Sequence, residues 1–348
     1  RTTFQLEALR KANVVDAGAQ GFVGLIEGMT DYIASGSQDD PAVLVPALDE
    51  SELAEVTAGV EEDLAHRYCT ECVVVGERVD RRHLREQLSA LGSSLVVAGL
   101  HDKVRVHIHV NDPAEVFRVA ARFGAVSGEK ADDMQRQQHS AHATGRRVAV
   151  VTDSAADIPF DELDRLDIHV VPLRVHFGDR SYLDKVGMTA EEFYEELARN
   201  PLHPKTSQPP MGDFRRQFEF LGSHFDSVVS VNLSRQVSGT CASAEAAAAR
   251  VTTHGKVAVI DSMNASLGLG LVAMYAAECA QAGYDAARVL EATRAIIPRT
   301  HTFGLIGSLE YAVRGGRVPR WVKNVADSLQ LMPVLQNDRK GRVTAGGA

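Results

Sequence analysis

Cysteine, aromatic residues and long apolar runs are all scarce in this chain of 348 residues. Four cysteines in a chain of this length do not make a disulfide framework, which favours a reducing compartment and predicts a cytoplasmic location. No apolar run approaches the ~20 residues that span a bilayer, and we expect no signal peptide. Basic residues are outnumbered too. The net charge of −9 disfavours nucleic acid as a partner, because neutralising phosphates takes clustered Lys and Arg.

Both ends of the chain suggest a piece of a larger protein. The chain begins at Arg1 rather than Met, and its last residues, Lys340 to Ala348, run out in Gly and Ala. We therefore expect a fragment. Its length and its globular composition, 45% hydrophobic and 24% charged, still predict two domains of ordinary size.

The first part of the chain is predicted to hold terminal helices over 1–40 and an α+β module over 43–140, which we call the central module. Apolar residues from Phe22 to Ile33 recur at helical spacing and predict a helix over 20–34. That helix is apolar enough to need a partner surface, within the chain or in a homodimer. In the central module the predicted strands are 72–75, 94–98 and 103–110, with helices over 81–91 and after Asp112.

A polar stretch, 127–147, has almost no large apolar residues and is the predicted domain boundary. From 146 to 348, which we call the second domain, apolar strands alternate with helices. This pattern predicts an α/β fold with a mostly parallel sheet and helices on both faces. The predicted strands are 148–151, 169–175, 228–231 and 257–260, and the clearest helices are 241–250 and 267–282.

Small hydroxyl residues and Gly follow several predicted strands of the second domain. Ligands of open α/β sheets lie outside the carboxyl ends of the strands, where helix N-termini present free N–H groups. The pattern suits a carboxylate or a phosphate, although Ser, Thr and Asp at one such junction can equally be N-caps worth ~1 kcal/mol. The segments concerned are 152–154, 205–209, 234–240 and 261–262.

A possible metal site lies in the central module. The stretch 104–110 alternates as a strand, which places His107 and His109 on one face. A third ligand could come from Cys69 or Cys72, and two His with one Cys suit zinc. Two half-exposed strand histidines would give the same pattern. The Cys69 and Cys72 pair could instead be a redox motif, but Cys72 runs into Val73–Val75 rather than into a helix.

The second domain resembles the DegV family of fatty-acid-binding proteins. The resemblance implies an acyl chain buried between two subdomains and a carboxylate held by hydroxyls at the sheet edge. By position, Thr206 and Ser238 would bind that carboxylate, with Ser154, Ser207 and Gly239 beside them. The motifs that match in order are 148–159, Val171-Pro-Leu173, Phe193-Tyr194, 205–209, Ser238-Gly-Thr240, Asp261-Ser262 and Gly315-Gly-Arg317.

The second domain departs from the family pattern in two respects. Ser234-Arg235 stands where the family usually has Ser-Ser, and Cys241 stands where an aromatic residue is usual. The family's C-terminal subdomain, with a histidine that helps to hold the carboxylate, would lie after Ala348. We expect that subdomain to be missing from the pocket.

Residues 1–140 resemble the end of the kinase domain and the central domain of the fatty-acid kinase family, which is related to dihydroxyacetone kinase. The resemblance implies a zinc ion held by Cys69, His107 and His109, with Cys72 in the core. The matching segments are Val14–Gly21, with Ala19 where Gly is usual, Tyr68–Glu71, Leu91–Ser94, Val106–His109 and Met134–Gln138.

Together the two resemblances imply a fatty-acid carrier fused to part of its kinase. The chain would bind a long-chain fatty acid and present it to a fatty-acid kinase domain in cis or in trans, with peripheral membrane contact for lipid exchange. We expect no phosphoryl transfer by residues 1–348, because no Walker-type loop occurs and the magnesium-binding acids would lie upstream of Arg1. Two other roles for the metal site remain open: a zinc-dependent hydrolase with Glu71 as base, and a purely structural site.

Overall fold

The computed structural model describes residues 65–142, 148–253, 255–316 and 318–347. The predicted terminal helices over 1–40, including the helix over 20–34 proposed for a homodimer, lie outside these residues.

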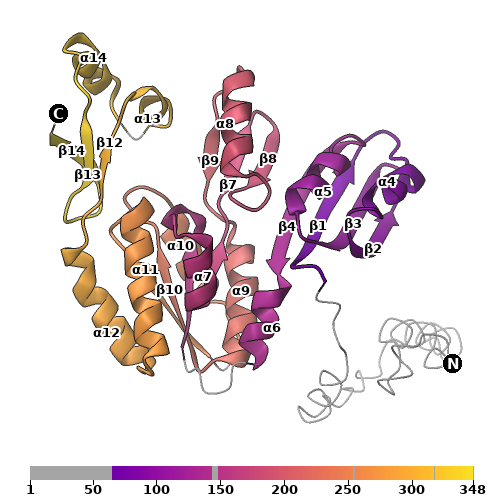
Figure 1. Cartoon of the computed structure of the whole chain (residues 1–348), viewed down its shortest axis with the longest axis horizontal. Helices are drawn as coiled ribbons and strands as arrows, with labels where there is room; N and C mark the ends of the chain where they lie inside the picture. The colour runs from indigo at the N-terminus through magenta and orange to yellow at the C-terminus, as the bar shows by residue number, and fades with distance from the viewer. Residues whose placement is uncertain (1–64, 143–147, 254, 317, 348) are drawn as a thin grey trace, which may run out of the picture. The chain divides into compact units, whose positions relative to one another are not determined.

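The central module is an antiparallel sheet with two helices on one face. The strands lie in the order β2-β3-β1-β4 (Figure 1). In β3 the valines and Ile108 are buried under the helices, while Arg105, His107 and His109 lie on the other face, as the alternation predicts. The bounds are β1 Tyr68–Val75, α4 Arg81–Leu88, β2 Ser93–Gly99, β3 Lys103–Val110, α5 Pro113–Ala120 and β4 Ala125–Asp133.

The predicted boundary at 127–147 is in fact structured over most of its length. It contains the greater part of β4 and the helix α6, Met134–His142. β4 stands at an edge of the sheet, and its charged side chains pair with residues of the second domain. The lack of large apolar residues goes with these ionic contacts.

The main sheet of the second domain is parallel and covered on both faces, as predicted. Its order is β11-β10-β5-β6. Helices α7, α11 and α12 pack on one face and helices α9 and α10 on the other (Figure 1). Every residue of β5 is buried, which is the pattern of a strand covered on both faces. The bounds are β5 Val148–Asp153, α7 Phe160–Leu166, β6 Ile168–Val171, α9 Met211–His224, β10 Ser227–Asn232, α10 Thr240–Ala248, β11 Lys256–Asp261, α11 Ser266–Gln281 and α12 Ala286–Ile296.

The predicted strand 169–175 is two strands in different sheets. β6 ends at Val171, and β7 begins at Arg174 after Pro172, which has no N–H to continue a ladder. β7 is the centre of a small sheet of order β8-β7-β9, and β9 carries Thr206. The bounds are β7 Arg174–Phe177, β8 Arg180–Leu183, α8 Ala190–Arg199 and β9 Lys205–Ser207.

The last elements form a three-stranded antiparallel sheet, β12-β13-β14, with two short helices. Within the described ranges, no helix is long and apolar enough to cross a membrane. The bounds are β12 Phe303–Leu305, α13 Glu310–Arg314, α14 Arg320–Ser328, β13 Val334–Asn337 and β14 Val343–Gly347.

Candidate functional sites

Two loops that carry predicted carboxylate ligands meet at the carboxyl edge of the parallel sheet. One leaves β9 after Thr206, and the other joins β10 to α10 through Ser238 and Gly239. A Cβ added at Gly239 would lie 1.9 Å from the side-chain oxygen of Gln208, so the two loops touch there. The hydroxyl of Ser243 donates to the carbonyl of Pro209 at 2.8 Å and fixes the same contact.

Of the predicted hydroxyls, Thr206 and Ser238 belong to the two segments that meet at this edge. Thr206 is exposed, and its hydroxyl makes no hydrogen bond with the residues that the structure describes. Ser238 is half-buried; its Oγ lies 2.8 Å from Oγ1 of Thr240 and accepts the N–H of Thr240 at 3.3 Å. This turn begins α10 and keeps the Ser238 hydroxyl at the N-terminal end of that helix.

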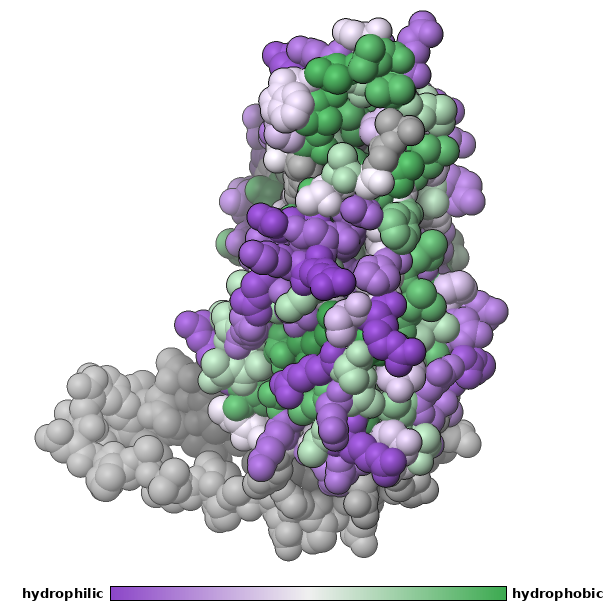
Figure 2. All heavy atoms as spheres, turned by 90° about the vertical axis from the view of Figure 1, so that its left-hand side faces the viewer, coloured by the Kyte–Doolittle hydropathy of each residue, from purple (hydrophilic) through white to green (hydrophobic). Residues whose placement is uncertain are grey.

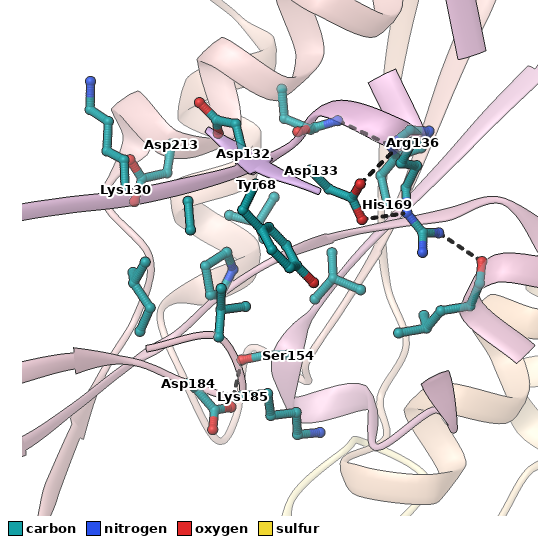
Figure 3. Close-up of a pocket in the computed structure, with 18 of the residues that line it drawn as sticks. Tyr68, Lys130, Asp132, Asp133, Arg136, Ser154, His169, Asp184, Lys185 and Asp213 are labelled. Carbon is teal, nitrogen blue, oxygen red and sulfur yellow. Dashed lines mark hydrogen bonds and ion pairs between the residues drawn. The ribbon is translucent and has the colours of Figure 1, made fainter. Parts of the chain in front are cut away.

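Ser154 and Ser207 are engaged elsewhere. Ser154 is 3% exposed; its hydroxyl donates to Asp184 at 2.6 Å and accepts the N–H of Leu173 at 2.9 Å (Figure 3). It therefore joins the loop after β5 to the β7–β8 segment. Ser207 is paired with His176 across the small sheet at 2.8 Å. The hydroxyls of Ser154 and Ser207 are therefore both already hydrogen-bonded to other side chains.

Arg235, one of the departures from the family pattern, ties the β10–α10 loop to its surroundings. Its guanidinium lies 3.0 Å from Asp261 at the end of β11 and 2.8 Å from Glu245 on α10. It also approaches the sulfur of Cys241 at 3.6 Å. The sequence showed both departures, but their contact depends on the turn between them.

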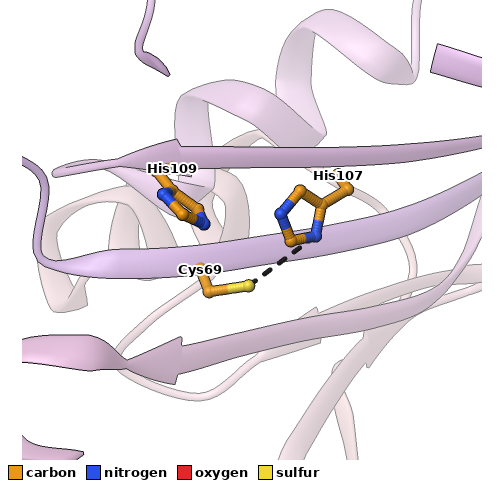
Figure 4. Close-up of side chains that lie close together, drawn as sticks. All are labelled: Cys69, His107 and His109. Carbon is orange, nitrogen blue, oxygen red and sulfur yellow. Dashed lines mark hydrogen bonds between the residues drawn. The ribbon is translucent and has the colours of Figure 1, made fainter. Parts of the chain in front are cut away.

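The predicted metal ligands come together on the open face of the central sheet. Cys69 on β1 pairs in register with His109 on β3, and Glu71 pairs with His107. The ligand atoms of Cys69, His107 and His109 all lie within 4.8 Å of one another (Figure 4). Burial raises the pKa of the Cys69 thiol to about 11, and the charges of Asp132 and Glu71 act in the same direction. One thiol and two imidazoles suit zinc, which binds the thiolate by displacing its proton.

Cys72 does not belong to this group. It is 1% exposed and lies on the opposite face of β1, and burial raises its pKa to about 12. Both cysteines are free thiols, and residues three apart on a strand point to opposite faces. The redox-pair interpretation of Cys69 and Cys72 is therefore wrong.

Glu71 is fully engaged by its neighbours. Its carboxylate accepts from Arg105 at 2.7 Å and lies 3.2 Å from Nδ1 of His107 and 3.7 Å from Lys130. Burial acts to raise the pKa of Glu71, but the hydrogen bonds from Arg105 and His107 outweigh it and hold the pKa below its ordinary value. A carboxylate so occupied is a poor general base, so the hydrolase alternative lacks support. The contact of Glu71 with His107 instead resembles the carboxylate–histidine pairs that orient metal ligands.

A cavity of about 260 Å³ lies where the central module meets the second domain (Figure 3). Tyr68 and Asp133 line it from one side, and Asp184 lines it from the other. Beside it Arg136, on α6, donates to the carbonyls of Leu163 and Ile168 at 2.7 and 2.6 Å. No local sequence pattern marks this junction, because its residues come from six separate segments.

Comparison with protein families gives two matches along the chain. The model of the uncharacterised DegV family matches residues 147–347. The model of the FakA-like middle domain of fatty acid kinase matches residues 65–141.

Individual relatives match the second domain. A DegV domain-containing protein of Caldanaerobacter subterraneus is 35% identical over 192 residues, which are 55% of this chain and 68% of that protein. Protein DegV of Bacillus subtilis is 32% identical over 194 residues, 56% of this chain and 69% of that protein.

Solved structures match the same region. A DegV family protein of Thermus thermophilus, described for its fatty acid binding, is 35% identical with a TM-score of 0.52, over 58% of this chain and 71% of that one. The structure of B. subtilis DegV, described as a fatty acid binding protein, is 30% identical with a TM-score of 0.51, over 58% and 71% of the two chains.

Proposed function

Because this chain belongs to the DegV family, we propose that it binds a long-chain fatty acid at the carboxyl edge of its parallel sheet. The observation that carries the proposal is the contact between Gln208 and Gly239, which brings the Thr206 and Ser238 loops together with accessible hydroxyls. The fatty acids bound by solved relatives support the same ligand class.

The two hydroxyls and the N-terminal end of α10 suit a carboxylate head group. Hydrogen bonds to a charged group are worth ~1.5–3 kcal/mol each, and a helix N-terminus favours an anion. Each CH₂ of the acyl chain that leaves water adds ~0.8 kcal/mol. Exposed Phe303 and Leu305 on β12 offer an apolar surface for that chain. Tyr311 on α13 stacks on His203, near the start of β9, with ring centroids 5.4 Å apart.

Mass spectrometry of an organic extract from purified, denatured protein tests this proposal. We expect a fatty acid at close to one equivalent in the wild type and at least a tenfold loss in Thr206→Ala/Ser238→Ala, since each lost bond is worth ~1.5–3 kcal/mol. The control is Ser223→Ala, whose hydroxyl bonds only to neighbours on its own helix, the carbonyl of Phe220 and Nδ1 of His224. A double variant that retains the fatty acid as well as wild type would refute the assignment of the head-group site.

We propose that lipid exchange uses α14 and the loop after it at a membrane surface. Trp321, Val325 and Leu329 recur every four residues on one face of the helix and its end, with exposed fractions of 67, 49 and 62%. Apolar side chains gather over this end of the molecule (Figure 2). Apolar faces with an aromatic anchor are typical of helices that lie in the membrane interface.

The chain has one tryptophan, so Trp321 fluorescence reports on this contact alone. We expect a blue shift on adding vesicles of phosphatidylglycerol and phosphatidylcholine, and its loss in Val325→Asp/Leu329→Asp. An unchanged spectrum at saturating lipid would refute the contact.

For the central module we propose a structural zinc site and a role in recognising a fatty-acid kinase domain, in cis or in trans. The assembled Cys69, His107 and His109 group and the family match over 65–141 support this proposal. Metal analysis of the purified chain should give one zinc per chain in the wild type and none in His107→Ala. We further propose domains over 1–40, 43–140 and 146–348. We also propose a cytoplasmic location, which is consistent with four free thiols.

A further inference from the structure

The cavity where the central module meets the second domain is lined by both apolar and charged side chains. Its volume of about 260 Å³ lies just below the ~300–1,000 Å³ of most ligand pockets, so it suits a small molecule. The charged side chains come mainly from β4, α6 and α9. The apolar ones come mainly from β6, from the loops after β5 and β6, and from the end of β8 with its following turn; they include Ile158, Val171, Pro172, Leu183 and Val186.

The ionisable side chains of this lining carry one excess negative charge. There are five carboxylates and four cationic groups, which gives a net charge of −1 with His169 neutral. Four of the five carboxylates pair with an arginine, at distances between 2.7 and 3.5 Å. The exception is Asp184. The carboxylates are Glu129, Asp132, Asp133, Asp184 and Asp213, and the cationic groups are Lys130, Arg136, Lys185 and Arg216.

Asp184 is a half-buried carboxylate that only a neutral group contacts. It accepts the hydroxyl of Ser154 at 2.6 Å, and among the residues that the structure describes no cation pairs with it (Figure 3). Lys185, the next residue, pairs instead with Asp157 at 2.6 Å. Burial raises the pKa of Asp184, and the hydrogen bond from Ser154 and the charge of Lys185 oppose this without cancelling it. A cation that enters the cavity would therefore stabilise the ionised form of Asp184.

Tyr68 lines the opposite side of the cavity, on the central module (Figure 3). Its hydroxyl makes no hydrogen bond with the part of the chain that the structure describes. A phenol oxygen both donates and accepts, so the Tyr68 hydroxyl can accept an N–H of a ligand in the cavity.

We propose that this cavity binds a small organic cation, a protonated primary amine with a compact apolar body. Its ammonium group pairs with Asp184, and the Tyr68 hydroxyl offers a further hydrogen bond to the same ligand. An ammonium has three N–H donors and no acceptor, which matches a carboxylate and a free phenol. The apolar body packs against side chains such as Val171, Pro172 and Leu183.

NMR titration of the full chain with benzylamine tests the proposal, with benzyl alcohol as an uncharged probe of the same shape. We expect benzylamine to bind with a dissociation constant on the order of 0.1–1 mM, as befits so small a molecule, and benzyl alcohol about tenfold more weakly. Asp184→Asn keeps an oxygen that accepts from Ser154 but removes the charge. This variant should bind benzylamine weaker by about tenfold or more, with unchanged binding of benzyl alcohol.

Asp179→Asn is the matched control, because it removes one negative charge from the exposed turn between β7 and β8, outside the cavity lining. It should bind benzylamine within about twofold of the wild type. Tyr68→Phe keeps the ring and removes only the hydroxyl, so we expect a loss of about threefold. Thr206→Ala/Ser238→Ala should bind benzylamine as the wild type does. Loss of binding in that double variant would place the amine at the head-group site and overturn the proposal.

Circular dichroism checks the fold of each variant. If Asp184→Asn does not fold, the comparison of the two probes on the wild type, together with Tyr68→Phe, still decides the question. Equal affinity of the wild type for benzylamine and benzyl alcohol would overturn the proposal. Unchanged affinity in a folded Asp184→Asn, or no saturable binding at millimolar benzylamine, would do the same.

Discussion

The two sheets of this chain hold their candidate sites in different ways. In the antiparallel central sheet the metal group stands in mid-strand, on one face, and strand register brings Cys69 opposite His109. In the parallel sheet the inner strands β5 and β10 are almost entirely buried, and the ligand residues lie on loops outside the strands. A site of the first kind depends on pairing between neighbours. A site of the second kind depends on contacts between loops, such as Gln208 on Gly239.

The largest effect should come from the core beneath the parallel sheet. Phe218 on α9 is fully buried, so Phe218→Ala should lower the free energy of unfolding by about 3–5 kcal/mol through the cavity it leaves. Urea unfolding followed by circular dichroism measures it, with the 70%-exposed Leu100→Ala as control. A loss below about 1 kcal/mol would mean that the central sheet carries the stability of the whole.

Arg136 tests whether the two sheets unfold together. Its side chain is 9% exposed and also pairs with Asp133 and Asp164, so Arg136→Ala removes two carbonyl contacts and two ion pairs at once. We expect a loss of about 3 kcal/mol and two separate transitions in thermal unfolding. Arg165→Ala, which removes an exposed pair with Glu162, is the matched control. A single transition in Arg136→Ala would show that other contacts are enough to make the two sheets unfold together.

Asp153, at the end of β5, should give the parallel sheet its own pH dependence. Burial raises the pKa of Asp153 from 3.8 to about 6, although Leu233, Asn232 and Ala155 donate to its carboxylate. The folded state then binds the proton more tightly than the unfolded state. Protonation of Asp153 therefore contributes fully to the free energy of unfolding below about pH 4, and this contribution is lost as the pH rises through 6. The total change is about 3 kcal/mol. The midpoint of urea unfolding should fall from pH 4 to 7 in the wild type, and this fall should be absent in Asp153→Asn. An unchanged fall in Asp153→Asn would assign the pH dependence to another group.

Ser154 and Ser238 should separate stability from binding at the same sheet edge. Ser154→Ala leaves Asp184 and the N–H of Leu173 without their partner, and we expect a loss of about 2 kcal/mol in stability with full retention of fatty acid. Ser238→Ala should show the reverse, with stability changed by less than about 1 kcal/mol and fatty acid reduced. Loss of ligand in Ser154→Ala at unchanged stability would place Ser154 in the head-group site.

The contrast between the sheets also explains what the sequence could predict. Alternation within one strand was enough to place His107 and His109 together and to bury Ile108. Hydroxyl positions after the parallel strands were recognisable, but which hydroxyls stay available depends on partners distant in sequence. Ser154 is taken by Asp184, 30 residues away.

The junction between the parts was the hardest feature to predict. Charge in β4 is balanced by Arg174 and Arg216 of the second domain, which no local pattern reveals. The split of the predicted strand 169–175 was also missed, although Pro172 within it was a visible signal.

Only residues 143–147 separate the end of α6 from the start of β5 in sequence. A connection of this length turns what would be an encounter between two molecules into an event within one. Short tethers set effective concentrations on the order of millimolar, whatever the amount of each protein in the cell. A kinase that recognises the central module would therefore find a lipid carrier beside it in fixed one-to-one ratio, and competition among free carriers would no longer decide which fatty acid it meets.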